Sequence, residues 1–274
     1  MVYHQLLKRN IFALTGSIRV LPDFLVIGAK RCGTTSLFYH LPEHPCISKS
    51  PHDNMGFFND NFHLGVNWYK SFFPTIFTRN KIKSEFGNFL AFDVTTTYME
   101  EGSTANNVYQ TKPNMKIIVV LRNPVDRAYS QYHLNVREKA EKRSFVDVVE
   151  ENMNELKKES HERYEIKPKF SAEGNNYLKK GLYAQQLRRW LKIFPRENML
   201  ILSTEEFESN QQTIYNKIFE FLNISRFEVK NTEKMEKGSY PPMKSETRSL
   251  LLDYFRSHNN ELFKLINKKF DWEK

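Results

Sequence analysis

The stretch Phe24–Leu41, FLVIGAKRCGTTSLFYHL, combines the features of a strand, a glycine loop and a helix. Phe24–Gly28 is a short apolar run ending in glycine, as in a buried strand of a parallel sheet. Gly28 and Gly33 have the G-x-x-x-x-G spacing of a loop that cradles nucleotide phosphates. We therefore expect a strand, a phosphate-binding loop and a helix that begins at Thr34.

The residue after the second glycine departs from the triphosphate-binding pattern. Lysine at that position contacts the β- and γ-phosphates of ATP, whereas this chain has Thr34. The basic residues stand earlier in the loop, as Lys30 and Arg31. Backbone N–H groups at a helix N-terminus bind phosphate without lysine or metal. The loop thus suits a single phosphate better than ATP, although alone it also fits a strand-to-helix turn without a ligand.

A second motif follows the clearest strand of the sequence, Lys116–Leu121 (KIIVVL), which is rich in β-branched residues. Arg122 stands at the carboxyl end of this strand, where ligands of open α/β sheets bind. Ser130 lies about two helical turns later. Together they could hold a second phosphate. A surface pair of Arg122 or Arg127 with Asp126 is the alternative interpretation.

Strands and helices alternate along the rest of the chain. We expect strands at Phe89–Val94 and Asn198–Ser203, and loops with short helical pieces over His44–Pro74. Further helices are expected over residues 126–142, 178–194, 214–222 and 247–265. This alternation predicts an α/β fold, a P-loop-like three-layer sandwich with a central, mainly parallel sheet and helices on both faces.

The composition indicates one basic globular domain. The 274 residues are 40% hydrophobic, which is enough for a large core. We expect a single domain over 1–274, with an N-terminal extension over 1–20. Lys and Arg outnumber Asp and Glu by 41 to 32, a net charge of +9. This excess favours an anionic partner: nucleic acid, an acidic membrane or a highly charged cofactor.

The cysteines and the N-terminal residues bear on the compartment. Cys32 and Cys46 have no metal-ligand spacing and do not suggest a disulfide scaffold, so a reducing compartment is expected. Lys8, Arg9 and Arg19 interrupt the apolar residues of the first twenty. No apolar stretch of about 20 residues is present, so we expect no membrane span or signal peptide and a cytoplasmic protein.

Taken together, these motifs resemble those of sulfotransferases that use 3′-phosphoadenosine 5′-phosphosulfate (PAPS). PDFLVIGAKRCGTTSL resembles the family's 5′-phosphosulfate loop, and LRNPVDRAYSQY its 3′-phosphate motif in the carbohydrate and heparan sulfate type. YLKKGLYAQQLRRWLKIFPRENMLIL resembles its central helix and next strand, and KGSYPPMKSETRSLLLDYFRSHNNELFKLI its cofactor-covering loop and final helix. The resemblance, from about Leu21 to Trp272, implies sulfuryl transfer with adenosine 3′,5′-bisphosphate (PAP) as product and no metal.

The resemblance also implies which residues bind the cofactor. Arg31 stands where the family has its catalytic lysine and keeps a positive charge for the leaving phosphate oxygen. Arg122 and Ser130 match the 3′-phosphate pair, and a Lys-Gly pair opens the covering loop at 237–243. The expected cofactor-binding residues are Lys30, Arg31, Cys32, Gly33, Thr34, Thr35, Ser36, Arg122, Ser130, Tyr183, Lys237, Gly238 and Ser239.

The chain departs from the family where the acceptor is expected to lose its proton. Related enzymes carry a glutamate in a Lys/Arg-x-Glu-x-His-Phe-Phe-like segment, and this chain reads SPHDNMGFFND. Aligning Phe57-Phe58 places Asn54 at the glutamate position and Gly56 at the histidine position. Because an amide cannot act as a general base, another residue must serve. The candidates are His52, Asp53, His133 and Asp93.

The acceptor is the partner that the sequence describes least. A hydroxyl or amine nitrogen of a small metabolite, natural product or sugar is expected, with a polysaccharide as the alternative. The aromatic loop Phe57–Tyr69 could line its pocket. The rival functions are an ATP-dependent nucleotide or metabolite kinase, a polyanion-binding protein, and a family member that binds the cofactor without catalysis. No recognised nucleic-acid motif accompanies the charge, so nucleic acid is not expected as a partner.

Overall fold

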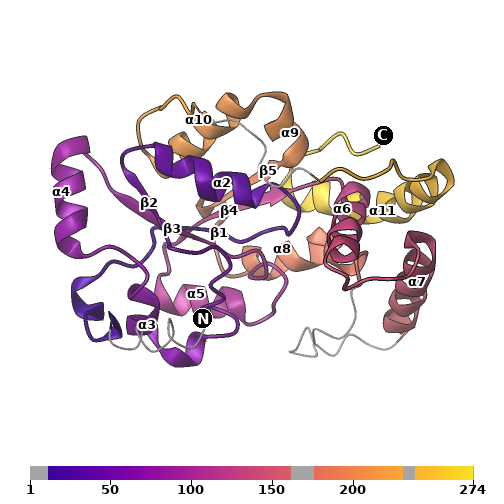
Figure 1. Ribbon diagram of the computed structural model, residues 1–274, viewed down its shortest axis with the longest axis horizontal. Coiled ribbons are helices and arrows are strands. Elements are labelled where there is room, and N and C mark those ends of the chain that lie inside the picture. The colour runs from indigo at the N-terminus through magenta and orange to yellow at the C-terminus, as the bar shows by residue number, and fades with distance from the viewer. Residues whose placement is uncertain (1–11, 162–175, 231–237, 274) are drawn as a thin grey trace.

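The sheet of this protein consists of five parallel strands in the order β2-β3-β1-β4-β5. Figure 1 shows the computed structural model, which describes residues 12–161, 176–230 and 238–273. The strands are β1 Phe24–Val26, β2 Ile47–Lys49, β3 Leu90–Val94, β4 Lys116–Leu121 and β5 Met199–Ser203.

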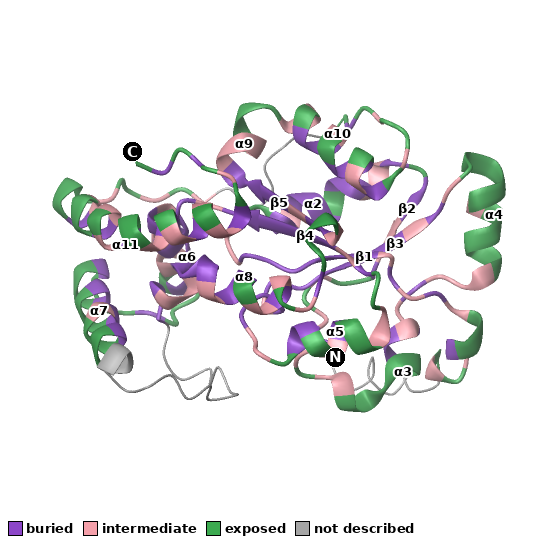
Figure 2. Ribbon diagram, turned by 180° about the vertical axis from the view of Figure 1, so that it is seen from behind, coloured by how far each residue is buried: buried purple, intermediate pink, exposed green. Residues whose placement is uncertain are grey.

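Helices lie on both faces of this sheet. The α-helices are α2 Thr34–His40, α3 Val66–Lys70, α4 Ile76–Phe86, α5 Thr104–Thr111, α6 Pro124–Arg137, α7 Phe145–His161, α8 Tyr183–Leu191, α9 Thr204–Ser209, α10 Gln211–Leu222 and α11 Ser245–Ile266. The short 3₁₀ helices are η1 Gly16–Ile18, η2 Leu41–Glu43, η3 Phe62–Leu64, η4 Lys179–Gly181 and η5 Arg196–Asn198. In Figures 1 and 2, α2, α9 and α10 lie on one side of the sheet, and α5 and α8 on the other. The expected α/β sandwich is confirmed.

The central strands form as expected from their apolar sequence. Residues 117–121 of β4 and all of β1 are buried, because helices cover both faces of the sheet at its centre. Phe24 of β1 lies opposite Phe92 of β3 in the register, and their rings stack with centroids 4.9 Å apart. These contacts place the carboxyl ends of β1, β3 and β4 side by side.

Strand β2 and helix α6 differ from the expectation in kind and in extent. Ile47–Lys49 is a strand, β2, in a region expected to form loops; it pairs with β3 alone, so neighbouring backbone rather than its own pattern defines it. Helix α6 begins at Pro124 and ends at Arg137, instead of running from 126 to 142. Its early start has a local cause: the side chain of Asn123 accepts a hydrogen bond from Val125 N–H, and proline fits the first helical position.

The helix expected over 178–194 is interrupted near its start. Residues 179–181 form η4 and the regular helix α8 begins at Tyr183. Gly181 lies at the interruption, where an added Cβ would come within 2.8 Å of Pro124 and 2.9 Å of Phe255. Glycine therefore lets α6 and α11 approach this turn, which fixes α6 and the residues that it carries.

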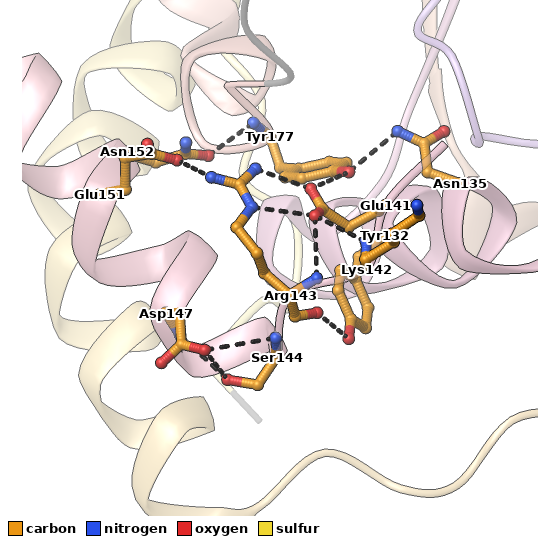
Figure 3. Close-up of polar contacts among 10 residues, drawn as sticks. All are labelled: Tyr132, Asn135, Glu141, Lys142, Arg143, Ser144, Asp147, Glu151, Asn152 and Tyr177. Carbon is orange, nitrogen blue, oxygen red and sulfur yellow. Dashed lines mark hydrogen bonds and ion pairs between the residues drawn. The ribbon is translucent and has the colours of Figure 1, made fainter. Parts of the chain in front are cut away.

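A polar network ties the end of α6 to α7 (Figure 3). The buried carboxylate of Glu141 accepts hydrogen bonds from Arg143 Nε over 2.9 Å and from Arg143 Nη2 over 2.8 Å, and this arginine also pairs with Glu151. The Arg143 guanidinium holds the pKa of Glu141 at about 2. Asn135 of α6 donates to the hydroxyl of Tyr177 over 2.9 Å. The network thus anchors the carboxyl-terminal end of the helix that carries Ser130.

The structure also describes the two cysteines and the lengths of the helices. Cys32 and Cys46 are buried free thiols. Across the described part of the chain, no helix combines the length and apolarity needed to cross a membrane.

Candidate active site

The glycine loop leaves β1 and is held against the neighbouring strand β4. Ala29 N–H donates to Val120 O over 2.7 Å, and Val120 N–H donates to Gly28 O over 2.8 Å. Gly33 precedes α2 with φ of +85°, a left-handed conformation that favours glycine, and a Cβ there would meet nothing within 4 Å. The loop therefore leaves open space before α2, where the unpaired N–H groups of a first helical turn can bind an anion.

A cavity of about 290 Å³ opens at this loop. It lies where β1, β3, β4 and β5 end, which is where ligands of open α/β sheets bind. The described residues that line it are Lys30, Arg31, Gly33, Thr34, Thr35, Asp53, Asn54, Thr96, Arg122, Ser130, Leu134, Thr204, Gly238 and Tyr240.

The lining is cationic. It carries the side chains of Lys30, Arg31 and Arg122, and Asp53 is the only carboxylate among its described residues. Burial lowers the pKa of Lys30, and the nearby charge of Lys180 lowers it further. An anion bound beside this amine would favour its charged form. The electrostatics of the cavity therefore suit a ligand with several negative charges.

The two expected phosphate motifs meet in this cavity although they are far apart in the sequence. Arg31 Nε donates a hydrogen bond to Ser130 Oγ over 3.2 Å. Arg122 Nη1 lies 3.4 Å from Arg31 O. Thr204 Oγ1 lies 3.0 Å from both Cys32 O and Leu121 O, so one hydroxyl at the start of α9 links the glycine loop to the end of β4.

Two residues expected to bind the cofactor stand behind the loop rather than on the cavity surface. Cys32 is buried, and this burial raises the pKa of its thiol to about 12, so the thiol is in its neutral form near pH 7. Ser36 is buried in the first turn of α2, with its N–H bonded to Gly33 O over 3.1 Å. Both side chains therefore lie on the inner side of the loop, away from the cavity.

Tyr183 also lies outside the lining. Its ring is buried, and its hydroxyl donates to Arg122 O over 3.0 Å. The Tyr183 hydroxyl therefore fixes the backbone at Arg122 and does not face the cavity. In the covering loop, Gly238 and Tyr240 line the cavity and Ser239 does not, whereas the expected ligand Lys237 lies outside the described residues.

The segment expected to supply the base places one carboxylate on the cavity. Asn54, which takes the position of the family glutamate, has φ of +54°, and its Oδ1 accepts hydrogen bonds from Thr96 N–H and Thr96 Oγ1, each over 3.1 Å. Asn54 N–H donates to Val94 O over 2.6 Å. Asn54 thus fastens the loop to the end of β3, and its neighbour Asp53 supplies the carboxylate at the cavity.

Asp93 is buried beneath this loop and is not part of the cavity lining. Its carboxylate accepts hydrogen bonds from the hydroxyls of Tyr69 over 2.9 Å, Tyr98 over 3.0 Å and Thr95 over 3.0 Å. Burial raises the pKa of Asp93 to about 6. The hydroxyl of Tyr98 in turn accepts from Phe57 N–H over 2.9 Å. Asp93 therefore lies under this loop and does not face the cavity.

The two candidate histidines do not line the cavity either. His52 is exposed on the loop. The ring of His133 stacks on Tyr240 with centroids 4.5 Å apart and contacts the edge of Tyr129 at 4.4 Å. His133 Nε2 is buried and finds no hydrogen-bond partner among the described residues, and burial lowers its pKa. His133 is therefore placed to hold the covering loop rather than to receive an acceptor proton.

Four lining residues were not expected from the sequence: Thr96, Leu134, Thr204 and Tyr240. Thr96 and Thr204 follow the carboxyl ends of β3 and β5, and this position after a parallel strand was a usable signal. Leu134 lies one helical turn after Ser130. Tyr240 lies in the covering loop expected at 237–243, and its ring stacks on His133 of α6.

The fold and cavity define a class of protein before any comparison is made. A parallel sheet with a glycine loop after β1 and a cationic cavity at its carboxyl edge is the architecture of P-loop-like proteins that bind phosphate-bearing ligands. Among the described residues, no group of three or more His, Cys, Asp or Glu side chains could hold a metal ion. The family model described as the sulfotransferase domain matches residues 21–274. The chain belongs to the sulfotransferase family and is an enzyme of that class.

Known proteins similar to this chain carry related names. The membrane-associated sulfotransferase kil1 of Dictyostelium discoideum is 26% identical over 94% of this chain and 68% of its own length. Human bifunctional heparan sulfate N-deacetylase/N-sulfotransferase 3 is 29% identical over 95% of this chain, which spans only 31% of that protein. A sulfotransferase crystal structure from Alicyclobacillus acidocaldarius superposes with a TM-score of 0.70 at 26% identity, covering 93% of this chain and 100% of that one. The expected resemblance is confirmed.

Proposed function

We propose that this enzyme transfers a sulfuryl group from PAPS to a hydroxyl or amine nitrogen of an acceptor. The observation that carries the proposal is the meeting of the two phosphate motifs: Arg31 contacts Ser130, and Arg122 lines the same cavity. One phosphate would lie before α2 in the open space at Gly33. The second would lie at Arg122 and Ser130.

The residues of the cavity fit this donor. PAPS and its product PAP carry about four negative charges, and the lining carries three basic side chains with several hydroxyls. Arginine and hydroxyl donors bind phosphate oxygens through charge-assisted hydrogen bonds and need no metal. The position filled by lysine in ATP-binding loops is Thr34, which lines the cavity and offers a hydroxyl instead.

The proposed reaction is a displacement at sulfur that the chain aligns and stabilises. The acceptor oxygen or nitrogen forms a bond to sulfur while the bond from sulfur to the 5′-phosphate oxygen breaks. Arg31 stabilises the negative charge that develops on that departing oxygen. Asp53 takes the acceptor proton and later passes it to water, which contributes about 10²–10⁴-fold to the rate. PAP then leaves with the electron pair of the broken bond.

We propose a sugar hydroxyl or amine as the acceptor, with a small metabolite as the alternative. The names of relatives that act on heparan sulfate support a sugar. Because this chain spans 31% of that relative, a polymeric acceptor is a separate proposal that the acceptor panel below would test. Cytoplasmic location also stays a proposal, which cell fractionation would test.

Ligand binding tests the donor first. Calorimetry with PAP in a metal chelator is expected to show binding, and ATP with Mg²⁺ little or none. Arg31→Ala and Arg122→Ala are each expected to weaken PAP binding about 10- to 100-fold through loss of a charge-assisted contact. Arg79→Ala, an exposed arginine on α4, is the matched control.

The outcomes separate the rival functions. Binding of ATP with Mg²⁺ but not of PAP would indicate a kinase and overturn the proposal. Heparin binding that survives the double variant of Arg31 and Arg122 would indicate a polyanion-binding protein. Turnover of labelled PAPS on a panel of sugars, oligosaccharides, amines and phenols then identifies the acceptor, and PAP binding without turnover on any of them would indicate an inactive family member.

A further inference from the structure

The peptide group between Arg122 and Asn123 is held at both of its polar atoms. Its carbonyl oxygen, on Arg122, accepts a hydrogen bond from the hydroxyl of Tyr183 over 3.0 Å. Its N–H, on Asn123, donates to Glu205 Oε1 over 2.8 Å. A planar peptide group with both polar atoms bonded to buried or half-buried side chains has one orientation. That orientation fixes the backbone from which the side chain of Arg122 extends.

The other oxygen of the Glu205 carboxylate binds the segment that follows α11. Trp272 Nε1 donates to Glu205 Oε2 over 2.9 Å. The side-chain amide of Asn123 returns to the same segment, with Nδ2 3.3 Å from Trp272 O. Glu205 therefore bridges the turn after β4 and the segment after α11, two parts of the chain about 150 residues apart, as the separation of 149 between Asn123 and Trp272 shows.

Trp272 also reaches the second side chain that holds the peptide. Its indole is 2% exposed and lies 6.0 Å from the ring of Tyr183 and 4.8 Å from the ring of Phe270, between centroids. The indole thus contacts both side chains that fix the peptide group, one by a hydrogen bond and one by packing. Neither Glu205 nor Trp272 lines the cavity.

We infer that Glu205 and Trp272 are positioning residues that fix the Arg122–Asn123 peptide and thereby aim the guanidinium of Arg122 into the donor cavity. The inference takes the identity of the ligand from the proposed function, whereas the arrangement of Arg122 is a property of the chain alone. A purely structural role would lower the stability of the fold and leave the ligand affinity of the folded protein unchanged.

Two conservative substitutions each remove a hydrogen bond of the Glu205 carboxylate, and a third substitution is the control. Glu205→Gln removes the acceptor for one of the two N–H groups, and Trp272→Phe keeps an aromatic ring but loses the indole N–H. Glu206→Gln changes the next residue of α9, which pairs with Lys268 over 2.8 Å and does not contact the Arg122–Asn123 peptide. Glutamine is also accepted at the capping-box position that Glu206 occupies.

Calorimetry with PAP and donor kinetics give the first readout. We expect Glu205→Gln and Trp272→Phe to raise the Kd for PAP and the KM for PAPS about 3- to 10-fold, the range of one lost hydrogen bond. The kcat at saturating donor should change less than KM, and Glu206→Gln should match the unmodified protein. In an Arg122→Ala background, Glu205→Gln should cause no further loss, because residues that act through one another are not additive.

Nuclear magnetic resonance of the ligand-free protein gives a second readout. The Arg122 Nε–Hε group should become more mobile in Glu205→Gln and Trp272→Phe, and not in Glu206→Gln. Unchanged Arg122 mobility in Glu205→Gln, or an equal loss of PAP affinity with and without Arg122, overturns the inference. Failure of the unmodified protein to bind PAP would instead overturn the proposed function, and the mobility measurement would still decide the role of Glu205. Should Trp272→Phe not fold, Glu205→Gln carries both measurements.

Discussion

Asp53 and Asn54 are adjacent in the sequence, but their side chains have different roles. The amide oxygen of Asn54 is occupied by two hydrogen bonds from Thr96, and the carboxylate of Asp53 lies on the cavity. Alignment by sequence alone compares Asn54 with the family glutamate and finds no base. In the structure, Asn54 has a left-handed backbone, and its neighbour Asp53 also lines the cavity.

Replacement of Asp53 is the test of this assignment. Asp53→Asn keeps the shape of the side chain and removes its ability to accept a proton, so kcat should fall about 10²- to 10⁴-fold. The Kd for PAP should change little, because Asp53 acts on the acceptor. Fixed-time assays with labelled PAPS and the best substrate of the acceptor panel measure kcat.

His52→Ala is the control for this variant, since His52 is exposed and does not line the cavity. It should retain the kcat of the unmodified enzyme. Full activity of Asp53→Asn, together with a large loss in His52→Ala, would show that the loop turns the other way in the working enzyme and that His52 is the base.

At the scale of elements, the glycine loop and α2 act as one unit. Gly33 has a left-handed backbone, and the space that its Cβ would occupy is open. Gly87 at the end of α4 has nearly the same φ, +79° against +85°, and its Cβ would also meet nothing within 4 Å. The two glycines thus share a backbone conformation that would strain any other residue, but of the two only Gly33 lines the cavity.

This pair separates ligand binding from backbone strain. Gly33→Ala and Gly87→Ala should each lower the free energy of unfolding by about 1 kcal/mol, the cost of alanine in a left-handed conformation. Only Gly33→Ala should weaken PAP binding, by 10-fold or more, since its methyl group fills the space expected for the 5′-phosphate. Urea unfolding and calorimetry on both variants measure these effects, and equal PAP affinities in the two would contradict the placement of that phosphate.

The elements also show what the sequence could and could not predict. The run KIIVVL predicts β4 with its observed ends, because buried β-branched residues leave little choice. Strand β2 was missed, because Ile47–Lys49 is short, is partly polar and lies at the sheet edge. Helix α5, eight residues from Thr104 to Thr111, was also missed, because so short a helix shows too few apolar repeats to predict it.

The same limit applies to the site. Arg31, Arg122 and Ser130 were predicted because each belongs to a local motif next to a strand end, and the structure brings all three to one cavity. Whether Asp53, His52, His133 or Asp93 serves as base depends on how distant segments orient each side chain. The contacts of Glu205 with the Arg122–Asn123 peptide and with Trp272 join three segments of the chain, and no local sequence pattern indicates them.

At the scale of the whole molecule, the order of the strands explains why one cavity collects so many segments. After β1, the chain forms β2 and β3 on one side of β1 within the sheet. It then crosses to the other side of β1, where it forms β4 and β5. The connections after β1 and β4 therefore diverge between two adjacent strands, and such a point forms a crevice at the carboxyl edge. Arg31 follows β1 and Arg122 follows β4, so both lie at this crevice.

The stability of the whole fold is linked to pH through one buried group of this core. Asp93 is fully buried, and its burial raises its pKa from 3.8 to about 6. The folded chain therefore binds this proton more tightly than the unfolded chain does. The stabilisation is fully present below the unfolded pKa and is lost as the pH rises through the folded pKa. Between pH 5 and pH 8, Asp93 should cost the fold about 1.4 kcal/mol, the equivalent of one pKa unit.

Asp93→Asn should remove this dependence while keeping an oxygen for the hydroxyls of Tyr69 and Tyr98. Urea unfolding at pH 5 and pH 8 measures the free energy of unfolding of both proteins. The unmodified protein should lose about 1.4 kcal/mol more than Asp93→Asn over this interval. Asp60→Asn, an exposed residue of the same loop, should behave like the unmodified protein. Parallel pH curves for the unmodified protein and Asp93→Asn would mean that Asp93 ionises in the folded protein as readily as in the unfolded chain, and that its three hydroxyl contacts offset its burial in full.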